Sequence, residues 1–114
     1  MKSNYKFGEV IALKEQIEVS AEKVQSRQVF ETAGGGVVLL GFKEGQKLET
    51  HLSPAEVMVN VVEGEIEFTM NGIAHTIKEN EFLLIGGGVP HSVMAKKDSK
   101  VMLVKIKADN GTSL

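Results

Sequence analysis

The chain has 114 residues, enough for one domain with one hydrophobic core and too few for two domains of common size. Hydrophobic residues make up 42% of the chain and charged residues 25%, as in soluble globular proteins, so disordered and fibrous classes are excluded. Thirteen Lys and Arg stand against fifteen Asp and Glu, giving a net charge of -2, and the two signs are interspersed. This balance argues against nucleic acid or an anionic membrane as a partner.

The chain contains no cysteine, which excludes disulfides, thiolate metal ligands and cysteine nucleophiles. Its first residues alternate charged side chains with isolated apolar ones, without the apolar run of a secretory signal. No stretch approaches the roughly 20 apolar residues of a membrane-spanning helix. We therefore expect a cytoplasmic protein.

The segment over residues 12–25 allows two interpretations. Its apolar residues Leu13, Ile17, Ala21 and Val24 recur at helical spacing, so an amphipathic helix is one alternative. The other, which we prefer, is a helical turn followed by a strand at residues 17–19.

Most of the remaining chain has the pattern of short strands. Residues 65–70 alternate polar and apolar, and the Asn71-Gly72 pair that follows predicts a tight hairpin, because a type I′ turn needs positive φ at both central residues. Short β-branched or apolar runs bounded by turn residues predict the other strands. The predicted strands cover residues 24–30, 36–42, 57–62, 65–70, 73–77, 82–85, 91–95 and 101–106.

This spacing of strands and turns predicts an all-β sandwich or closed barrel. We assign one barrel domain to residues 1–114, with its core over about 24–107 and a short N-terminal extension over 1–23.

Two of the three histidines stand where strands begin or end. His51 ends one strand, just before the turn that contains Ser53 and Pro54, and His91 begins another strand after a run of three glycines and Val89-Pro90. His75 follows the hairpin turn without a polar neighbour to pair with, so we expect it on the surface.

Around His51 and His91 the chain resembles the cupin superfamily, small double-stranded β-helix barrels of jelly-roll topology. The first cupin motif is Gly, five residues, His-x-His, three or four residues, Glu, six residues and Gly. This chain has Gly45, five residues, His51-Leu52-Ser53, then Val57 or Met58 at the Glu position, and Gly64.

The second cupin motif is Gly, five residues, Pro-x-Gly, two residues, His, three residues and Asn. This chain has Asn80, the glycines 86–88, His91 and Ala95. The resemblance extends over residues 24–106, and the retention of one His in each motif is similar to a subgroup of small bacterial cupins of unassigned function.

The resemblance implies a metal site in which three His and one Glu hold Fe, Mn, Ni or Zn. Of those four ligands only His51 and His91 carry over, because Ser53 replaces the second His and Val57 or Met58 replaces the Glu. Two imidazoles alone make a weak site for a divalent transition metal. Glu56 could complete a set of two His and one carboxylate, but in a regular strand it would point away from the position of the family's Glu.

Asn60 interrupts an apolar run and shares its strand face with Met58. One interpretation places both residues, with His51 and His91, in a ligand-binding lining of the barrel cavity. The alternative places Asn60 on the outer face of the barrel or at a subunit contact.

The leading function is therefore a small-molecule-binding cupin, with a weakly held divalent metal at His51 and His91. The alternative is a metal-dependent cupin enzyme of dioxygenase or isomerase type, whose two-His site is completed by Glu56 or water. A structural dimerisation module is a third class. The residues 57–62 are apolar on both strand faces, more than one barrel interior needs, so we expect a homodimer.

Overall fold

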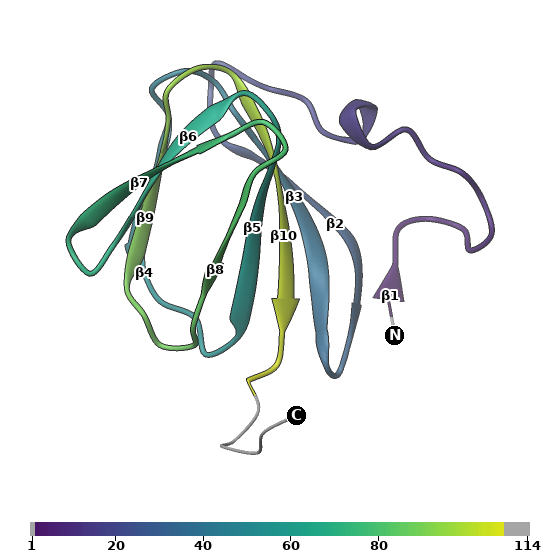
Figure 1. The fold of residues 1–114 in the computed structure, drawn as a ribbon. Helices are drawn as coiled ribbons and strands as arrows, with labels where there is room; N and C mark the ends of the chain where they lie inside the picture. Colours follow the sequence, from purple (N-terminus) through teal and green to yellow (C-terminus); the bar gives the residue numbers. More distant parts are fainter. Residues whose placement is uncertain (1, 109–114) are drawn as a thin grey trace.

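The alternating strands predicted from the sequence pair into two antiparallel sheets in the computed structural model, which describes residues 2–108 (Figure 1). One sheet has six strands, in the order β1 (Lys2–Ser3), β2 (Gln25–Thr32), β3 (Gly35–Phe42), β10 (Ser99–Ile106), β5 (Glu56–Glu63) and β8 (Phe82–Ile85). The other has four, in the order β4 (Lys47–His51), β9 (His91–Ala95), β6 (Glu65–Met70) and β7 (Ile73–Lys78).

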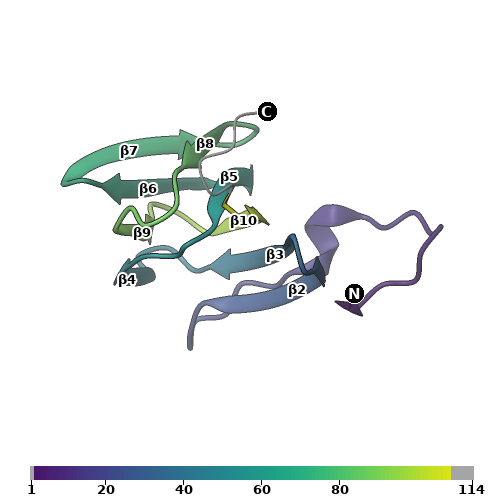
Figure 2. The ribbon, with the colours of Figure 1, turned by 90° about the horizontal axis from the view of Figure 1, so that it is seen from below.

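The two sheets form the layers of a jelly-roll barrel, which confirms the predicted all-β fold. Figure 2 shows the four-stranded sheet on one side of the six-stranded sheet, with the N-terminal segment reaching outward beyond β2. The last six residues assigned to the domain lie outside the described part of the chain. No helix within residues 2–108 is long and apolar enough to cross a membrane.

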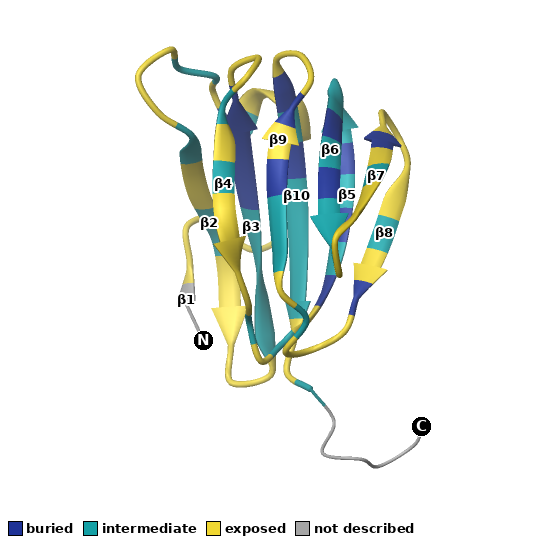
Figure 3. Cartoon of the chain, turned by 90° about the vertical axis from the view of Figure 1, so that its left-hand side faces the viewer, coloured by how far each residue is buried: buried dark blue, intermediate teal, exposed yellow. Residues whose placement is uncertain are grey.

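Strict alternation of side chains defines the core. Along β5, Val57, Val59 and Val61 are buried between the sheets, while the residues between them are half-buried on the opposite face. Buried residues gather toward one end of the central strands, as Figure 3 shows: the last four residues of β3 are buried, and so are Ser99 and Val101 at the start of the neighbouring β10. Phe42, Phe68 and Ile66 are at most 1% exposed, so the large side chains fill the space between the sheets.

The predicted hairpin is confirmed. β6 and β7 pair from Glu65 opposite Lys78 to Met70 opposite Ile73. Asn71 and Gly72 have φ of 51° and 75°, the left-handed conformation that a type I′ turn requires at both central positions. The other predicted strands are also present, several of them beginning or ending a residue or two from the predicted bounds.

The prediction for residues 12–25 is right for the helical turn and wrong for the strand. A short 3₁₀ helix covers Leu13–Gln16, and residues 17–19 form no strand. The backbone there crosses the sheet over Gly41, where an added Cβ would lie 2.1 Å from the carbonyl oxygen of Glu18. The segment is therefore stacked against a sheet face, with Ile17 buried, rather than paired along a strand edge. The two-residue strand β1 was not predicted.

Ser99 provides a test of the fold. It is fully buried at the start of β10, where its Oγ accepts a hydrogen bond from the Glu65 amide at 3.0 Å and lies 2.7 Å from the Lys97 carbonyl oxygen. Ser99→Ala leaves the partly buried Glu65 amide without its acceptor, so we expect the free energy of unfolding to fall by about 1–3 kcal/mol in urea denaturation. Ser26→Ala, at an exposed position of β2, is the control and should change it by less than about 0.5 kcal/mol. Equal effects of the two substitutions on the free energy of unfolding would contradict the structural role given to the Ser99 hydroxyl.

Candidate functional site

His51 and His91 meet at one end of the barrel. His51 is the last residue of β4 and His91 the first of the neighbouring β9, and the two are direct register partners. Opposite residues of an antiparallel pair share a sheet face, so both imidazoles point between the sheets. Their ring centroids lie 4.3 Å apart with an angle of 60° between the ring planes. The expected convergence of the two rings is therefore present.

A β-bulge gives His51 this inward direction. Leu48 pairs with Val93 and His51 with His91, so β4 advances three residues while β9 advances two, which leaves one extra residue in β4. Leu48 packs against the core, and without the extra residue simple alternation would turn His51 to the outside. The bulge thus brings the imidazole to the cavity.

Backbone carbonyl groups fix the orientation of both rings. Nδ1 of His51 lies 3.0 Å from the carbonyl oxygen of Glu49, and Nδ1 of His91 lies 2.9 Å from that of Val89. A carbonyl oxygen only accepts, so Nδ1 must be the protonated nitrogen in each pair, and Nε2 of each neutral ring keeps its lone pair. Within residues 2–108 neither Nε2 atom has a hydrogen-bond partner. His91 also stacks on Phe68, with centroids 5.3 Å apart.

The two rings line a cavity of about 310 Å³ between the sheets. Most of its surface is aliphatic, and the polar side chains that line it, His51, His91, Ser53 and Lys105, come from strand ends and the loop after β4. The site therefore combines an apolar interior with a polar mouth, the arrangement typical of small-molecule cavities. Aliphatic lining residues include Leu40, Leu48, Val57, Val59, Ile85 and Leu103.

The positions that correspond to the missing cupin ligands also face this cavity. Ser53 lines it, and the Oγ of this residue accepts a hydrogen bond from the Ala55 amide at 3.2 Å. Val57 lines it too, whereas Met58 lies on the opposite face of β5, so Val57 occupies the Glu position of the motif. An alkyl group at Val57 contributes no donor to a metal.

Glu56, Met58 and Asn60 lie on the face of β5 that points away from the cavity. They alternate with Val57, Val59 and Val61, which are buried between the sheets. The expected cavity role of Met58 and Asn60 does not match this geometry, because both belong to the outer-face alternative. Glu56 is exposed, and within residues 2–108 no cluster of three or more His, Cys, Asp or Glu could hold a metal ion. The carboxylate that could have completed the site is therefore not brought to the imidazoles, and Glu56 points away as strand alternation predicted.

His75 is not on the outer surface as expected. It pairs with Phe68, so both side chains lie on the inner face of the four-stranded sheet, where His75 is half-buried. It lines a separate hollow beside Phe82 at the opening between β7 and β8, and it takes no part in the barrel cavity.

Lys105 is the cavity residue that sequence reasoning missed. It follows Val101 and Leu103 at intervals of two along β10, and both of those side chains belong to the core. The same alternation, read one step further, places Lys105 on the inner face at the mouth. Because lysine side chains are mostly exposed to solvent, a lysine near the end of an apolar strand is ordinarily expected on the surface, and the sequence pattern did not indicate a cavity position.

Asp98 has a shifted pKa but lies far from the cavity mouth. The Asp98 carboxylate, in the turn before β10, accepts hydrogen bonds from the Glu44 amide at 2.9 Å and from Lys43 Nζ at 3.2 Å. These two donors hold the pKa of Asp98 below its ordinary value. The group joins two loops at the opposite end of the barrel and has no part in the cavity.

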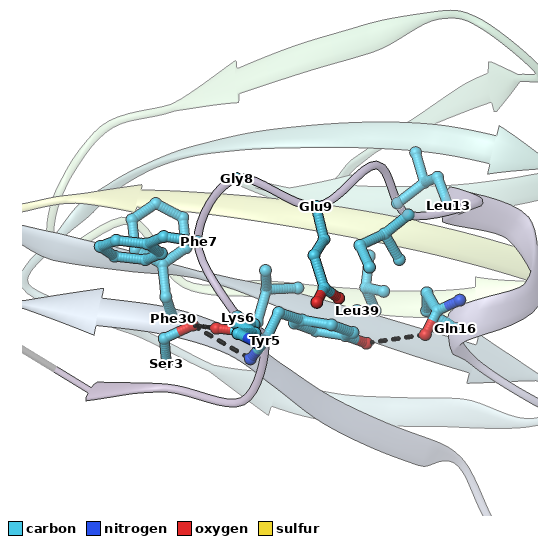
Figure 4. A pocket seen from close by; sticks show the side chains of 12 residues that line it. Ser3, Tyr5, Lys6, Phe7, Gly8, Glu9, Leu13, Gln16, Phe30 and Leu39 are labelled. Carbon is cyan, nitrogen blue, oxygen red and sulfur yellow. Dashed lines mark hydrogen bonds between the residues drawn. The ribbon is translucent and has the colours of Figure 1, made fainter.

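A second hollow of about 310 Å³ lies between the N-terminal segment and strands β2 and β3. Figure 4 shows Phe7 beside Phe30 and the Tyr5 hydroxyl directed at Gln16, to whose Oε1 it donates a hydrogen bond of 3.2 Å. The Ser3 hydroxyl likewise bonds to the Tyr5 backbone. Because these polar groups are bonded to one another, the barrel cavity is the better candidate site.

Residues 38–107 match the family model of the cupin domain, so the chain belongs to the cupin family. No protein of curated function is similar enough to match it.

Solved structures share the whole fold. A conserved protein of unknown function from Streptococcus pyogenes has a TM-score of 0.86 at 22% identity, covering 96% of this chain and 97% of that one. A cupin superfamily protein from Desulfitobacterium hafniense has a TM-score of 0.85 at 15% identity, covering 93% and 97%. A conserved protein with a double-stranded β-helix domain from Klebsiella pneumoniae has a TM-score of 0.77 at 23% identity, covering 90% and 92%. At these identities the likeness shows the fold alone.

Proposed function

We propose that this cupin binds a small molecule in the barrel cavity, with the ligand in contact with Nε2 of His51 and His91. The observation that carries the proposal is the pair of imidazoles, 4.3 Å apart, whose Nδ1 atoms are bonded to backbone carbonyls. The rings are thereby held in place before any ligand arrives, which reduces the entropy that binding would cost. The free Nε2 lone pairs accept hydrogen bonds at the mouth of an otherwise apolar cavity.

This arrangement favours a ligand with one polar end and an apolar body. A purely polar ligand would lose its water on entering the aliphatic interior without regaining hydrogen bonds there. A purely apolar one would leave the two Nε2 atoms without partners.

Hexan-1-ol is a suitable probe, because its hydroxyl can donate to an imidazole and its chain can enter the cavity. We expect it to shift the methyl NMR signals of Ile85 and Leu103, which line the cavity, and to leave that of Val104, on the outer face of β10, unchanged. Val57→Phe fills the cavity and should weaken binding by about tenfold or more. Met58→Phe, one residue along on the other face, is the control and should leave binding intact. Methyl shifts that are absent, or that survive Val57→Phe, would refute the proposal.

A divalent transition metal fits this site poorly, because the described residues bring only two imidazoles to it. We propose that Fe, Mn, Ni or Zn is held weakly there, by the two Nε2 atoms with water completing the coordination. The enzyme alternative depends on a third protein ligand, and the exposed position of Glu56 does not support one.

Restoring the cupin ligands tests which positions face the cavity. Ser53→His with Val57→Glu should raise zinc affinity, measured by calorimetry, by at least about tenfold over Ser53→His alone. Ser53→His with Met58→Glu places the same carboxylate on the outer face and should give no gain. An equal gain from both double variants would show that the assignment of Val57 to the ligand position is wrong.

We also propose that the protein forms a homodimer through the outer face of the six-stranded sheet. The outer residues of β5, β10 and β8 are largely apolar, and Phe82 and Leu84 are 61% and 66% exposed. A contiguous apolar patch of this kind is unusual on the free surface of a monomer. The apolar members of this face are Met58, Val62, Met102, Val104, Phe82 and Leu84.

Light scattering should therefore give the mass of a dimer, and Leu84→Glu should convert it to a monomer, because a buried unpaired carboxylate opposes association. Ile73→Glu is the matched control: Ile73 is similarly exposed, at 61%, but belongs to the four-stranded sheet. A monomer mass for the natural chain, or dissociation by both substitutions alike, would contradict the proposal.

A further inference from the structure

Lys105 is positioned at the cavity mouth, and no counter-ion for it lies among residues 2–108. It lies on the inner face of β10, half-buried, and lines the same cavity as His51 and His91. Within residues 2–108, no carboxylate lies within 4.0 Å of its Nζ, and Nζ donates no hydrogen bond, although lysines elsewhere do both. An ammonium group without an ion-pair partner, on a residue that lines an apolar cavity, is available to pair with an anionic ligand.

The residues paired with Lys105 on the adjoining strands provide it with no counter-ion. Its register partner on β3 is Gly36, which has no side chain, and its partner on β5 is Val57, which has only an alkyl one. Neither can accept a hydrogen bond from the ammonium group. The backbone at this point is closely packed, since a Cβ added to Gly35 would lie 1.9 Å from the Lys105 carbonyl oxygen.

Two of the polar groups at the mouth are complementary to a carboxylate. Lys105 supplies a positive charge and Ser53 a hydroxyl that can donate a hydrogen bond, whereas the Nε2 atoms of the two imidazoles only accept and so bond to a donor group of the ligand or to water. A charge-assisted hydrogen bond to an ammonium group is about twice as strong as a neutral one. The aliphatic interior beyond the mouth would hold an uncharged chain or ring.

We propose that the ligand of this cavity is a small organic monocarboxylate, with its carboxylate at Lys105 and its apolar body between the sheets. The inference rests on the proposed function, because it assigns the chemical class of the ligand to the same cavity. One ammonium group matches one carboxylate, whereas a phosphate dianion would bring a second charge into a cavity where the described lining residues offer no second Lys or Arg.

Hexanoate, hexanamide and hexan-1-ol test the inference, because they share a chain length and differ in the polar end. Titrations followed by the methyl signals of Ile85 and Leu103 should show hexanoate binding about tenfold or more tightly than either neutral probe, as expected for a hydrogen bond to a charged group. Lys105→Met keeps the length of the side chain and should bring hexanoate to within about twofold of hexanamide. Lys105→Arg retains the charge and should keep the preference.

Lys78→Met is the control for net charge. Lys78 is exposed at the end of β7 and does not line the cavity, so this variant should bind hexanoate like the natural chain. Thermal unfolding of each variant establishes that it is folded under the conditions of the titration.

Two failures are distinguishable. If hexan-1-ol or hexanamide binds in the cavity as tightly as hexanoate, and Lys105→Met leaves all three affinities unchanged, the carboxylate assignment is overturned while small-molecule binding stands. If none of the three probes shifts the cavity methyl signals, both the assignment and the proposed function are overturned.

Discussion

The site depends on one irregularity in the pairing of β4 with β9. The extra residue in β4 lets both Leu48 and His51 face inward, although they are three residues apart. Strand alternation permits that only where a bulge intervenes. Once His51 is directed inward, its register partner His91 follows on the same face, and the rings meet at 4.3 Å. The convergence therefore comes from backbone geometry, with no side-chain network needed to hold the two strands together.

Alternation along β5 and β10 determines the rest of the cavity. Val57 and Lys105 are register partners on the inner face, while Met58 and Val104 are partners on the outer face. Two consecutive residues of one strand thus have different roles: one side chain lines the cavity, and the next lies on the outer face, where a partner molecule can contact it. This two-sidedness explains how an apolar strand can contribute both to a barrel interior and to an exposed apolar face.

The sequence predicted the strands and the histidine pair because those features have local signals. The Asn71-Gly72 turn determines its own backbone conformation, and each His stands in a recognisable motif at a strand end. The strand expected at residues 17–19 failed because the close approach of Glu18 to Gly41 is a tertiary contact with no local pattern. The prediction for His75 was wrong because the direction of its side chain is set by its register with Phe68 across the hairpin, and the residues next to it in sequence do not show that register.

The substitutions at the cupin ligand positions change what the cavity can bind. With Ser53 and Val57 in place of a His and a Glu, the two imidazoles keep their Nε2 lone pairs but lose the donors that would hold a metal firmly. The loss of the Glu also removes the one negative charge that the family places at the mouth, and Lys105 remains without an opposing carboxylate among residues 2–108. Among the described residues, the fixed charge at the mouth is therefore positive. The proposed preference for a monocarboxylate follows from this charge, because a cation favours an anionic ligand and aliphatic walls favour an apolar body.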